Sequence, residues 1–352
     1  MGRVRRAAVA MVGLALSVIS LVLVASSVDV GAAARILAAV APGPLVVALA
    51  VAFVALALRA PTWQTLVPAR ADGSRVSLRR LMPIVVVGYL GNLLLPARLG
   101  EVLRAYLVSR REGIALGGAL GSVALERILD TAALAVMAFA AAAVAGATGW
   151  VLQGTGLLAG ASVVLLAGLA TVGLQPFLAI LLRVGHVPIM QAPVQALARR
   201  VEPFVHWSGG PHRRRAMVVT IGFCLVTAIC NAAMVWFVAQ AVGASLSPAG
   251  CVLLMAVAAL AAAIPAAPAN VGTYELAAVT VAASLGVPLD TALALAVLAH
   301  VLGLLPIMVG GPLALASLGG GLRNLSAAAL DESRVPSEGL EAVAPVASRR
   351  EA

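Results

Sequence analysis

Long apolar stretches are the feature that most restricts how this chain can fold. Several of them approach or exceed the ~20 residues that a helix needs to cross a bilayer. Of the 352 residues, 62% are hydrophobic and only 11% are charged. The stretches do not alternate polar and apolar residues over ~10 positions, which argues against a transmembrane β-barrel. The sequence therefore predicts an all-α, polytopic membrane protein.

Arginine marks the loops between the apolar stretches. All 24 basic residues are Arg, and the formal net charge is +10. In short loops such residues set topology and meet anionic headgroups, so we expect no nucleic-acid partner. The pattern predicts an inner (plasma) membrane protein with both termini in the cytoplasm. Arg59 is assigned to the first basic cytoplasmic loop, and Arg35 lies with Asp29 in a short outer loop.

About six full spans are expected, with two pairs of shorter segments among them. The spans are about 7–28, 43–60, 114–147, 157–182, 217–242 and 290–318. The shorter segments are 81–95 with 97–110 and 248–265 with 271–285, which we interpret as broken, re-entrant helical hairpins, with short tilted crossings as the alternative. An uncharged outer loop is expected at "TGWVLQGTG" and an amphipathic surface helix at 190–207. Residues 1–318 would form the transmembrane domain, and 319–352 a disordered cytoplasmic tail.

The two short pairs share a pattern. "LLPARLGEV" at 94–102 and "AAPANVGTYEL" at 266–276 both read Pro-Ala-x-x-Gly followed by Glu. By the charge rule, the first pair opens from the cytoplasm and the second from outside. Broken segments at corresponding positions of two inverted halves are typical of transporter sites. Each Pro suits the first turn of a half-helix, whose N-terminus attracts anions.

The first pair carries the densest charge in the membrane part. Arg98, Glu101 and Arg104 are three residues apart, so on a helix they share a broad face. We interpret them as lining a cavity in which the two Arg residues bind a phosphate. The alternative is an interfacial helix whose Arg side chains extend to the headgroups.

A second charged group lies inside the long helix expected at 114–147. Glu126, Arg127 and Asp130 follow about a dozen apolar positions. A charge at the bilayer centre costs at least ~2.5–3.5 kcal/mol, so each needs a partner or water. One alternative is an ion pair that only fixes helix packing. One residue of the three would still be left over, which favours a larger polar site.

Glu275 follows the second broken segment, with Asn270 and Tyr274 beside it. We predict that these three residues line the same cavity, while a simple helix cap is the alternative for Glu275. His300 is the single His of the last span, where a packing role is expected more often than a proton relay.

Two stretches resemble the lysylphosphatidylglycerol synthase transmembrane family. "GYLGNLLLPARLGEVLRAYLVSRREGIALGGALGSVALERILDTAAL" (88–134) is similar to its Asn…LLPxRxGE, RAYLL and ER-x-x-D pattern. "PAAPANVGTYELA" (265–277) is similar to its second region, where Ala269 and Asn270 replace a usual Gly-Gly. The resemblance implies an inverted-repeat domain that moves lipids between leaflets. Carried over by motif, it implies these site residues: Asn92, Arg98, Gly100, Glu101, Arg104, Glu126, Arg127, Asp130 and Glu275.

The resulting expectation is a stand-alone lipid transporter of flippase or scramblase type, without the aminoacyl-transferase domain of bifunctional members. Its substrate would be an anionic or aminoacylated phospholipid or a related lipid. No P-loop, GxGxxG, HExxH or GxSxG motif is present, so we expect no enzymatic activity, cofactor or metal. The alternatives are a membrane-embedded enzyme of polyprenyl-linked glycolipid metabolism and a scaffold for a separate lipid synthetase. A homo-oligomer is a further partner hypothesis.

Overall fold

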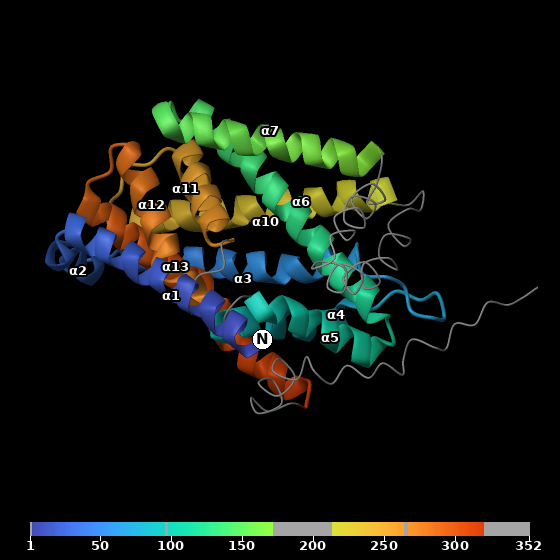
Figure 1. Cartoon of the computed structure of the whole chain (residues 1–352). Helices are drawn as coiled ribbons and strands as arrows, with labels where there is room; N and C mark the ends of the chain where they lie inside the picture. Colours follow the sequence, from blue (N-terminus) through green and yellow to red (C-terminus); the bar gives the residue numbers. More distant parts are fainter. Residues whose placement is uncertain (1, 96–97, 172–212, 264–266, 320–352) are drawn as a thin grey trace, which may run out of the picture.

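The computed structural model describes residues 2–95, 98–171, 213–263 and 267–319 (Figure 1). In these ranges every regular element is helical, which confirms the all-α prediction. The helices are α1 (Gly2–Ser27), α2 (Val30–Ala38), α3 (Pro42–Gln64), α4 (Leu78–Leu94), α5 (Leu99–Glu112), α6 (Leu116–Val144), α7 (Gly149–Thr171), α10 (Arg213–Val242), α11 (Pro248–Ala261), the 3₁₀ turn η2 (Pro268–Asn270), α12 (Thr273–Ser284) and α13 (Leu289–Ser317). The predicted helix at 190–207, the break at Pro96 and the tail from 320 lie outside the described residues.

Five of the described helices are long and apolar enough to cross a membrane. They are α3, α6, α7, α10 and α13. Part of α1 together with α2 passes the same test as a bent pair, with an angle of 86° between the two helices. This gives up to six spans and confirms a multi-pass helical membrane protein of the expected size.

Three local expectations were wrong. The outer loop expected after the first span is mostly the helix α2, which begins because the Asp29 carboxylate accepts a hydrogen bond from the Ala32 amide at 3.0 Å. The loop expected at "TGWVLQGTG" is mostly the first turns of α7, since apolar residues there continue the helix. Arg59 is not in a loop, because α3 continues to Gln64 with Pro61 inside the helix.

The two short helix pairs enter the fold from opposite ends. Ala41, just before α3, donates its amide to the carbonyl of Ala241 at the end of α10 at 3.2 Å. The hydroxyls of Thr65 and Thr220 meet at the other ends of these helices. The helices α3 and α10 are therefore antiparallel, so the pair that follows α3 and the pair that follows α10 start at opposite ends (Figure 1).

Each short pair also returns to the end from which it started. In the first pair, Arg80 at the start of α4 lies 3.5 Å from Glu112 at the end of α5. In the second, Gly250 near the start of α11 packs against Leu285 at the end of α12. The long helix after each pair packs on the other pair, α6 on α11 and α13 on α4. This reciprocal arrangement fits two re-entrant hairpins in an inverted repeat.

Glycines bring α4 and α5 into very close contact. A Cβ atom placed on Gly100 would lie 1.9 Å from the carbonyl oxygen of Gly88 and 2.4 Å from the amide of Asn92. A Cβ atom on Gly91 would lie 2.8 Å from the Cα atom of Gly100. Small residues allow membrane helices to pack backbone to backbone in this way. These contacts fix the start of α5 against α4.

We expect Gly100→Ala to lower the free energy of unfolding in detergent by about 1–3 kcal/mol, the usual cost of overpacking. The matched control is Gly222→Ala in α10, where an added Cβ meets nothing within 4 Å. That control should be neutral or slightly stabilising, because Ala is the better helix former. Thermal midpoints of the two variants give the comparison. An equal loss in both would show that the close contact between α4 and α5 does not limit the substitution.

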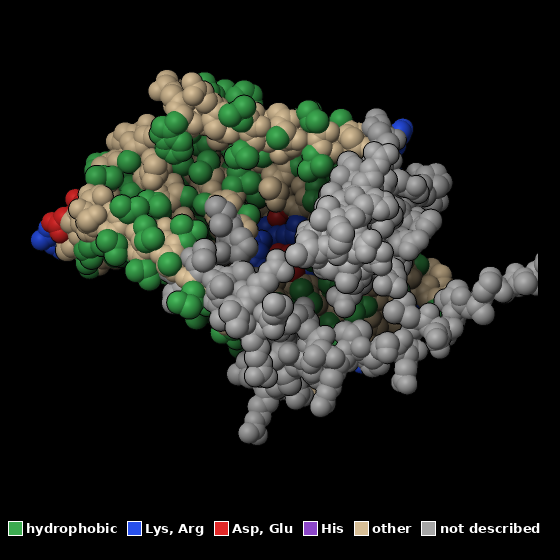
Figure 2. Space-filling model, in the orientation of Figure 1, with side chains coloured by type: hydrophobic (Ala, Val, Ile, Leu, Met, Phe, Trp, Pro, Cys, Tyr) green, Lys and Arg blue, Asp and Glu red, His purple; other side chains and the backbone are tan. Residues whose placement is uncertain are grey.

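The outer surface of the long helices is largely apolar. On α7, Leu157 is 76% exposed and Val164 is 73% exposed, as suits side chains that face lipid. Figure 2 shows hydrophobic side chains spread over this face, with a small group of Arg and acidic side chains recessed near its centre. The recessed group is the candidate site.

Candidate functional site

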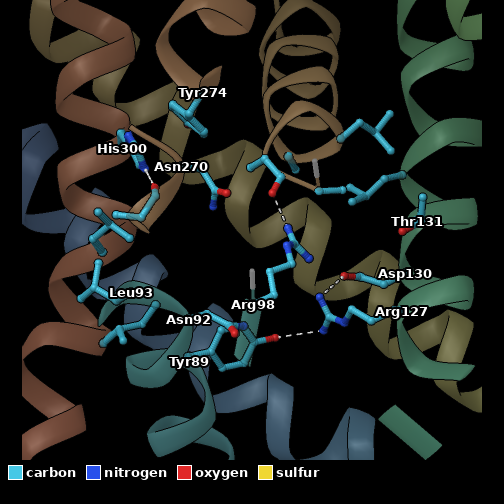
Figure 3. A pocket seen from close by; sticks show the side chains of 18 of the residues that line it. Tyr89, Asn92, Leu93, Arg98, Arg127, Asp130, Thr131, Asn270, Tyr274 and His300 are labelled. Carbon is cyan, nitrogen blue, oxygen red and sulfur yellow. Dashed lines mark hydrogen bonds and ion pairs between the residues drawn. The ribbon is translucent and has the colours of Figure 1, made fainter. Parts of the chain in front are cut away.

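A cavity of about 270 Å³ lies between the two hairpins and the long helices (Figure 3). Its polar lining residues come from both hairpins and from α3, α6 and α13: Arg59, Tyr89, Asn92, Arg98, Arg127, Asp130, Thr131, Asn270, Tyr274 and His300. Three guanidinium groups and one carboxylate are thus found among the described lining residues. We call this cavity the central pocket. Its charge suits an anionic ligand.

Arg98 connects the two hairpins. Its guanidinium donates through Nη2 to the carbonyl oxygen of Ala262 at the end of α11, and Nη1 lies 3.4 Å from Glu101 Oε1. Its backbone is left-handed, with φ 56° and ψ 35°, directly before α5. A non-glycine residue pays of order 1–2 kcal/mol for this conformation, and such strain is common at functional sites. The conformation turns the side chain into the central pocket (Figure 3).

Arg127 lies across the pocket in a network of acceptors. Its Nη2 atom donates to the Tyr89 hydroxyl at 3.2 Å and to Glu126 Oε1 at 3.1 Å. Its Nη1 atom lies 3.5 Å from Asp130, and its Nε atom lies 3.8 Å from Glu101. The Nε atoms of Arg98 and Arg127 have no hydrogen-bond acceptor in the described structure. Both Nε atoms are buried, so each guanidinium group has one donor that no described acceptor satisfies.

Arg59 is the partner of Asp130, at 3.0 Å. The sequence analysis left one charge of the Glu126, Arg127 and Asp130 group without a partner. Arg59, on α3, is that missing partner. A recognisable signal existed, since Arg59 lies in an apolar stretch long enough to be a span. Tyr89 and Thr131 were also missed, because a hydroxyl in an apolar helix carries no distinctive pattern.

Arg104 lies behind the central pocket and not in its lining. It is 2% exposed, its Nη2 atom is 2.7 Å from Glu126 Oε2, and its guanidinium lies 4.9 Å from the centre of the Trp63 ring. Glu126 is fully buried between Arg104 and Arg127. The two Arg residues that were expected to hold one phosphate thus face different surroundings. We therefore take Arg98 and Arg127 as the candidate anion ligands.

Asn92 and Asn270 line the pocket from different hairpins. Asn92 contributes a carboxamide whose Oδ1 atom is buried and has no hydrogen-bond donor among the described residues. Asn270 is left-handed, with φ 56°, in the break between α11 and α12. Figure 3 shows the Asn270 amide directed toward the space between Arg98 and His300. Both amides can bind polar headgroup atoms beside the guanidinium groups.

Glu275 caps α12 and does not line the pocket. Its Oε2 atom accepts a hydrogen bond from the Gly272 amide at 2.6 Å. Its Oε1 atom lies 2.6 Å from His300 Nδ1. The cap alternative therefore describes the position of this residue, and its own carboxylate occupies the positive end of the half-helix. Tyr274 does line the pocket, where its ring stacks on His300 with 4.2 Å between centroids.

In the break between α11 and α12, the backbone is left-handed at the two positions where the family motif usually has Gly-Gly. Ala269 has φ 59° and Asn270 has φ 56°. Asn tolerates this conformation, whereas Ala pays a steric cost. The Ala267 amide just before the break donates to Ser17 Oγ on α1 at 3.0 Å, which fixes the segment to a neighbouring helix.

We expect Ala269→Gly to raise the free energy of unfolding by up to about 1 kcal/mol, because Gly adopts this φ without a steric penalty. Ala267→Gly is the control, since Ala267 has an extended backbone with φ −61°. That variant should be neutral or destabilising, because only the unfolded chain gains freedom. Chemical-denaturant titrations in micelles measure both. A gain in the control equal to that of Ala269→Gly would contradict the strain assignment.

Most of the chain is similar to a known family of membrane proteins. Residues 10–311 match the model of the lysylphosphatidylglycerol synthase TM region, so the chain belongs to this family. It is also similar to glycosyltransferase AglD of Haloferax volcanii, at 29% identity over 136 residues. That match covers 39% of this chain and only 22% of the archaeal protein.

Proposed function

We propose that the protein is a lipid transporter of flippase or scramblase type in the inner (plasma) membrane, with both termini in the cytoplasm. The substrate would be an anionic or aminoacylated phospholipid or a related lipid-linked molecule. The observation that carries the proposal is the central pocket, which holds three Arg side chains deep among apolar helices. Such residues are costly in a membrane and are retained where they serve a pathway. Membership of the family supports the same reading.

The hairpins suggest how a headgroup would be held. Arg98 joins the tip of one hairpin to the Ala262 carbonyl of the other. A phosphate would compete for this guanidinium, since hydrogen bonds between two charged partners are stronger than those to a neutral carbonyl. Arg127, on the other side of the pocket, would donate a second bond. Binding would thereby release one contact between hairpins that open toward opposite ends of the protein.

The roles of the acidic residues follow from their positions. Glu101 and Asp130 lie beside the two proposed phosphate ligands, so they limit the positive charge when the pocket is empty. When an aminoacylated lipid is bound, they would also meet its cationic group. Asn92 and Asn270 would bind the neutral polar atoms of the headgroup.

A leaflet-exchange assay tests the proposal. Purified protein is placed in liposomes with a trace of fluorescent phosphatidylglycerol, and a membrane-impermeant quencher is added. We expect a fast phase that removes about half of the signal, followed by a protein-dependent slow phase that removes the rest. A labelled zwitterionic lipid should give a slower second phase, because it offers less net negative charge to the pocket. Quenching that stops at half for every headgroup would refute passive lipid exchange.

The similarity to glycosyltransferase AglD supports a second candidate, a membrane-embedded step in polyprenyl-linked glycolipid metabolism. In that case the pocket would hold a polyprenyl phosphate, and a carboxylate would act as base. The two candidates differ in products. Incubation with a polyprenyl phosphate and activated sugars would give a new glycolipid in the second case only. A scaffold that binds a separate lipid synthetase, as a homo-oligomer or alone, would give neither lipid exchange nor a new glycolipid.

A further inference from the structure

The ring of His300 contacts two hydrogen-bond acceptors. Its Nε2 atom lies 3.0 Å from the carbonyl oxygen of Ala269, and its Nδ1 atom lies 2.6 Å from Glu275 Oε1. A backbone carbonyl only accepts, so Nε2 must carry a hydrogen. A neutral imidazole then has no hydrogen left for Nδ1. The short contact with Glu275 therefore contains a second proton, on the ring or on the carboxyl group.

The Glu275–His300 pair thus holds one proton more than a neutral imidazole beside a carboxylate. Loss of this proton would place two lone pairs against each other, either at Glu275 or at Ala269. One of the two contacts would then break. Because these contacts fix the break between α11 and α12 to α13, the position of the second hairpin depends on whether the proton is present.

The pair borders the central pocket. The side chains of His300 and Glu275 are about 10% and 9% exposed, and His300 belongs to the pocket lining. In Figure 3 His300 lies beside Tyr274 and Asn270, across the pocket from Arg127 and Asp130. A proton that leaves the pair can therefore reach the same space as the substrate.

The charged and titratable groups that line the central pocket beside the pair come from several elements. Arg59 lies on α3, Tyr89 on α4, Arg98 before α5, Arg127 and Asp130 on α6, and Tyr274 on α12. On the remaining side α1 contributes Ser17, which has no titratable group. Three Arg side chains and one carboxylate line the pocket, and Glu101 and Glu126 lie beside Arg98 and Arg127. An anionic headgroup would offset the positive charge that these carboxylates leave. Substrate binding therefore changes the electric field in the pocket that the pair borders.

Two contacts hold residues on either side of the undescribed positions 264–266 of the second hairpin. Arg98 binds the Ala262 carbonyl before the break, and His300 binds the Ala269 carbonyl within it. The first contact responds to an anion and the second to a proton. Since Ala269 and Asn270 are both left-handed, release of these contacts would also relieve backbone strain.

We infer that the Glu275–His300 pair is a proton-binding site that couples lipid movement to a proton gradient. This inference rests on the proposed lipid transport and adds a second transported species, one proton for each lipid. Both substrates act on the same segment, the broken part of the second hairpin.

The test measures whether a pH gradient shifts the distribution of lipid between leaflets. Liposomes with protein and a trace of fluorescent phosphatidylglycerol are equilibrated with a pH difference of one unit. Equal potassium on both sides with valinomycin holds the membrane potential at zero. A pH difference of one unit is a tenfold ratio of protons, so one proton per lipid should give an about tenfold leaflet ratio. The fast quenching phase would then remove roughly 90% or roughly 10% of the signal instead of half.

Two variants test whether this gradient-driven change in the fast phase depends on the Glu275–His300 pair. Glu275→Gln can keep both contacts without a titratable proton, since its carbonyl accepts from Gly272 and its amide donates to a neutral His300. We expect its fast phase to stay at half despite the gradient. Asp290→Asn, a matched change near the start of α13 and outside the pocket lining, should shift as the natural protein does. Size-exclusion profiles check that both variants are folded.

The outcomes separate the two proposals. A slow phase with a fast phase of half, with and without the gradient, would overturn proton coupling and leave lipid exchange intact. A shift that persists in Glu275→Gln would move the proton site elsewhere and overturn the assignment to this pair. Absence of any slow phase would overturn both proposals. In the natural protein, nigericin should return the fast phase to half within the same sample.

Discussion

Replacement of Glu126 by Gln should lower the free energy of unfolding by about 3–5 kcal/mol. Glu126 is fully buried and pairs with Arg104 at 2.7 Å and with Arg127 at 3.1 Å. Removal of one partner of a buried ion pair leaves an unpaired buried charge, and that cost is the source of the figure. The unpaired charge of Arg104 would account for most of this cost, because Arg104 is only 2% exposed.

The charge origin of this effect can be separated from loss of shape. Arg104→Met combined with Glu126→Gln removes the stranded charge, so the double variant should recover part of the stability lost by the single one. A double-mutant cycle then gives the coupling between the two side chains. Denaturant titration in micelles is the measurement. Additive losses would show that the two residues contribute independently and that the buried pair is not the reason for either cost.

The positions of Glu126, Arg127 and Asp130 on α6 bear on the two roles, structural and functional, that the sequence left open for them. Glu126 and Arg104 form an internal pair between α5 and α6, packed on Trp63. Arg127 and Asp130 face the central pocket. The position of Glu126 therefore fits the structural interpretation, and the positions of Arg127 and Asp130 fit the functional one that we propose, each on a different side of the same helix.

Hydropathy was sufficient to predict the long helices among the described residues, though not all of their ends, because each long apolar stretch must satisfy its backbone hydrogen bonds internally in lipid. The two hairpins were also predictable, since Pro and Gly interrupt stretches that are too short to span. The α2 helix could not be recognised by the same rule. It is nine residues long, too short for a span, and it begins through the local cap of Asp29.

The candidate site was harder to predict than the fold. Helical spacing placed Arg98 and Arg104 on one face, but Arg98 is left-handed and precedes α5, so the spacing rule does not apply to it. The pairs Arg59–Asp130 and Glu275–His300 join residues on different helices. Such contacts depend on how helices pack, and one sequence does not contain that information.

The largest effect on transport is expected for Arg98→Ala. A hydrogen bond between charged partners contributes about 1.5–3 kcal/mol, which corresponds to a roughly 10- to 100-fold slower exchange of an anionic lipid if this contact is made on the way across. Arg98→Lys should be intermediate. Lys keeps the charge, but its single ammonium group cannot reproduce the planar fork that contacts both Ala262 and Glu101.

The slow quenching phase in the leaflet-exchange assay measures both variants at equal amounts of reconstituted protein. Arg35→Ala is the matched control, because that side chain is 79% exposed on α2 and outside the pocket lining. Its rate should equal that of the natural protein. If Arg98→Ala slowed a zwitterionic phospholipid as much as phosphatidylglycerol, Arg98 would act through its contact between the hairpins or on the phosphate that both lipids carry, and not through the net charge of the headgroup. Selective slowing of the anionic lipid would show that Arg98 acts on the net negative charge of the headgroup.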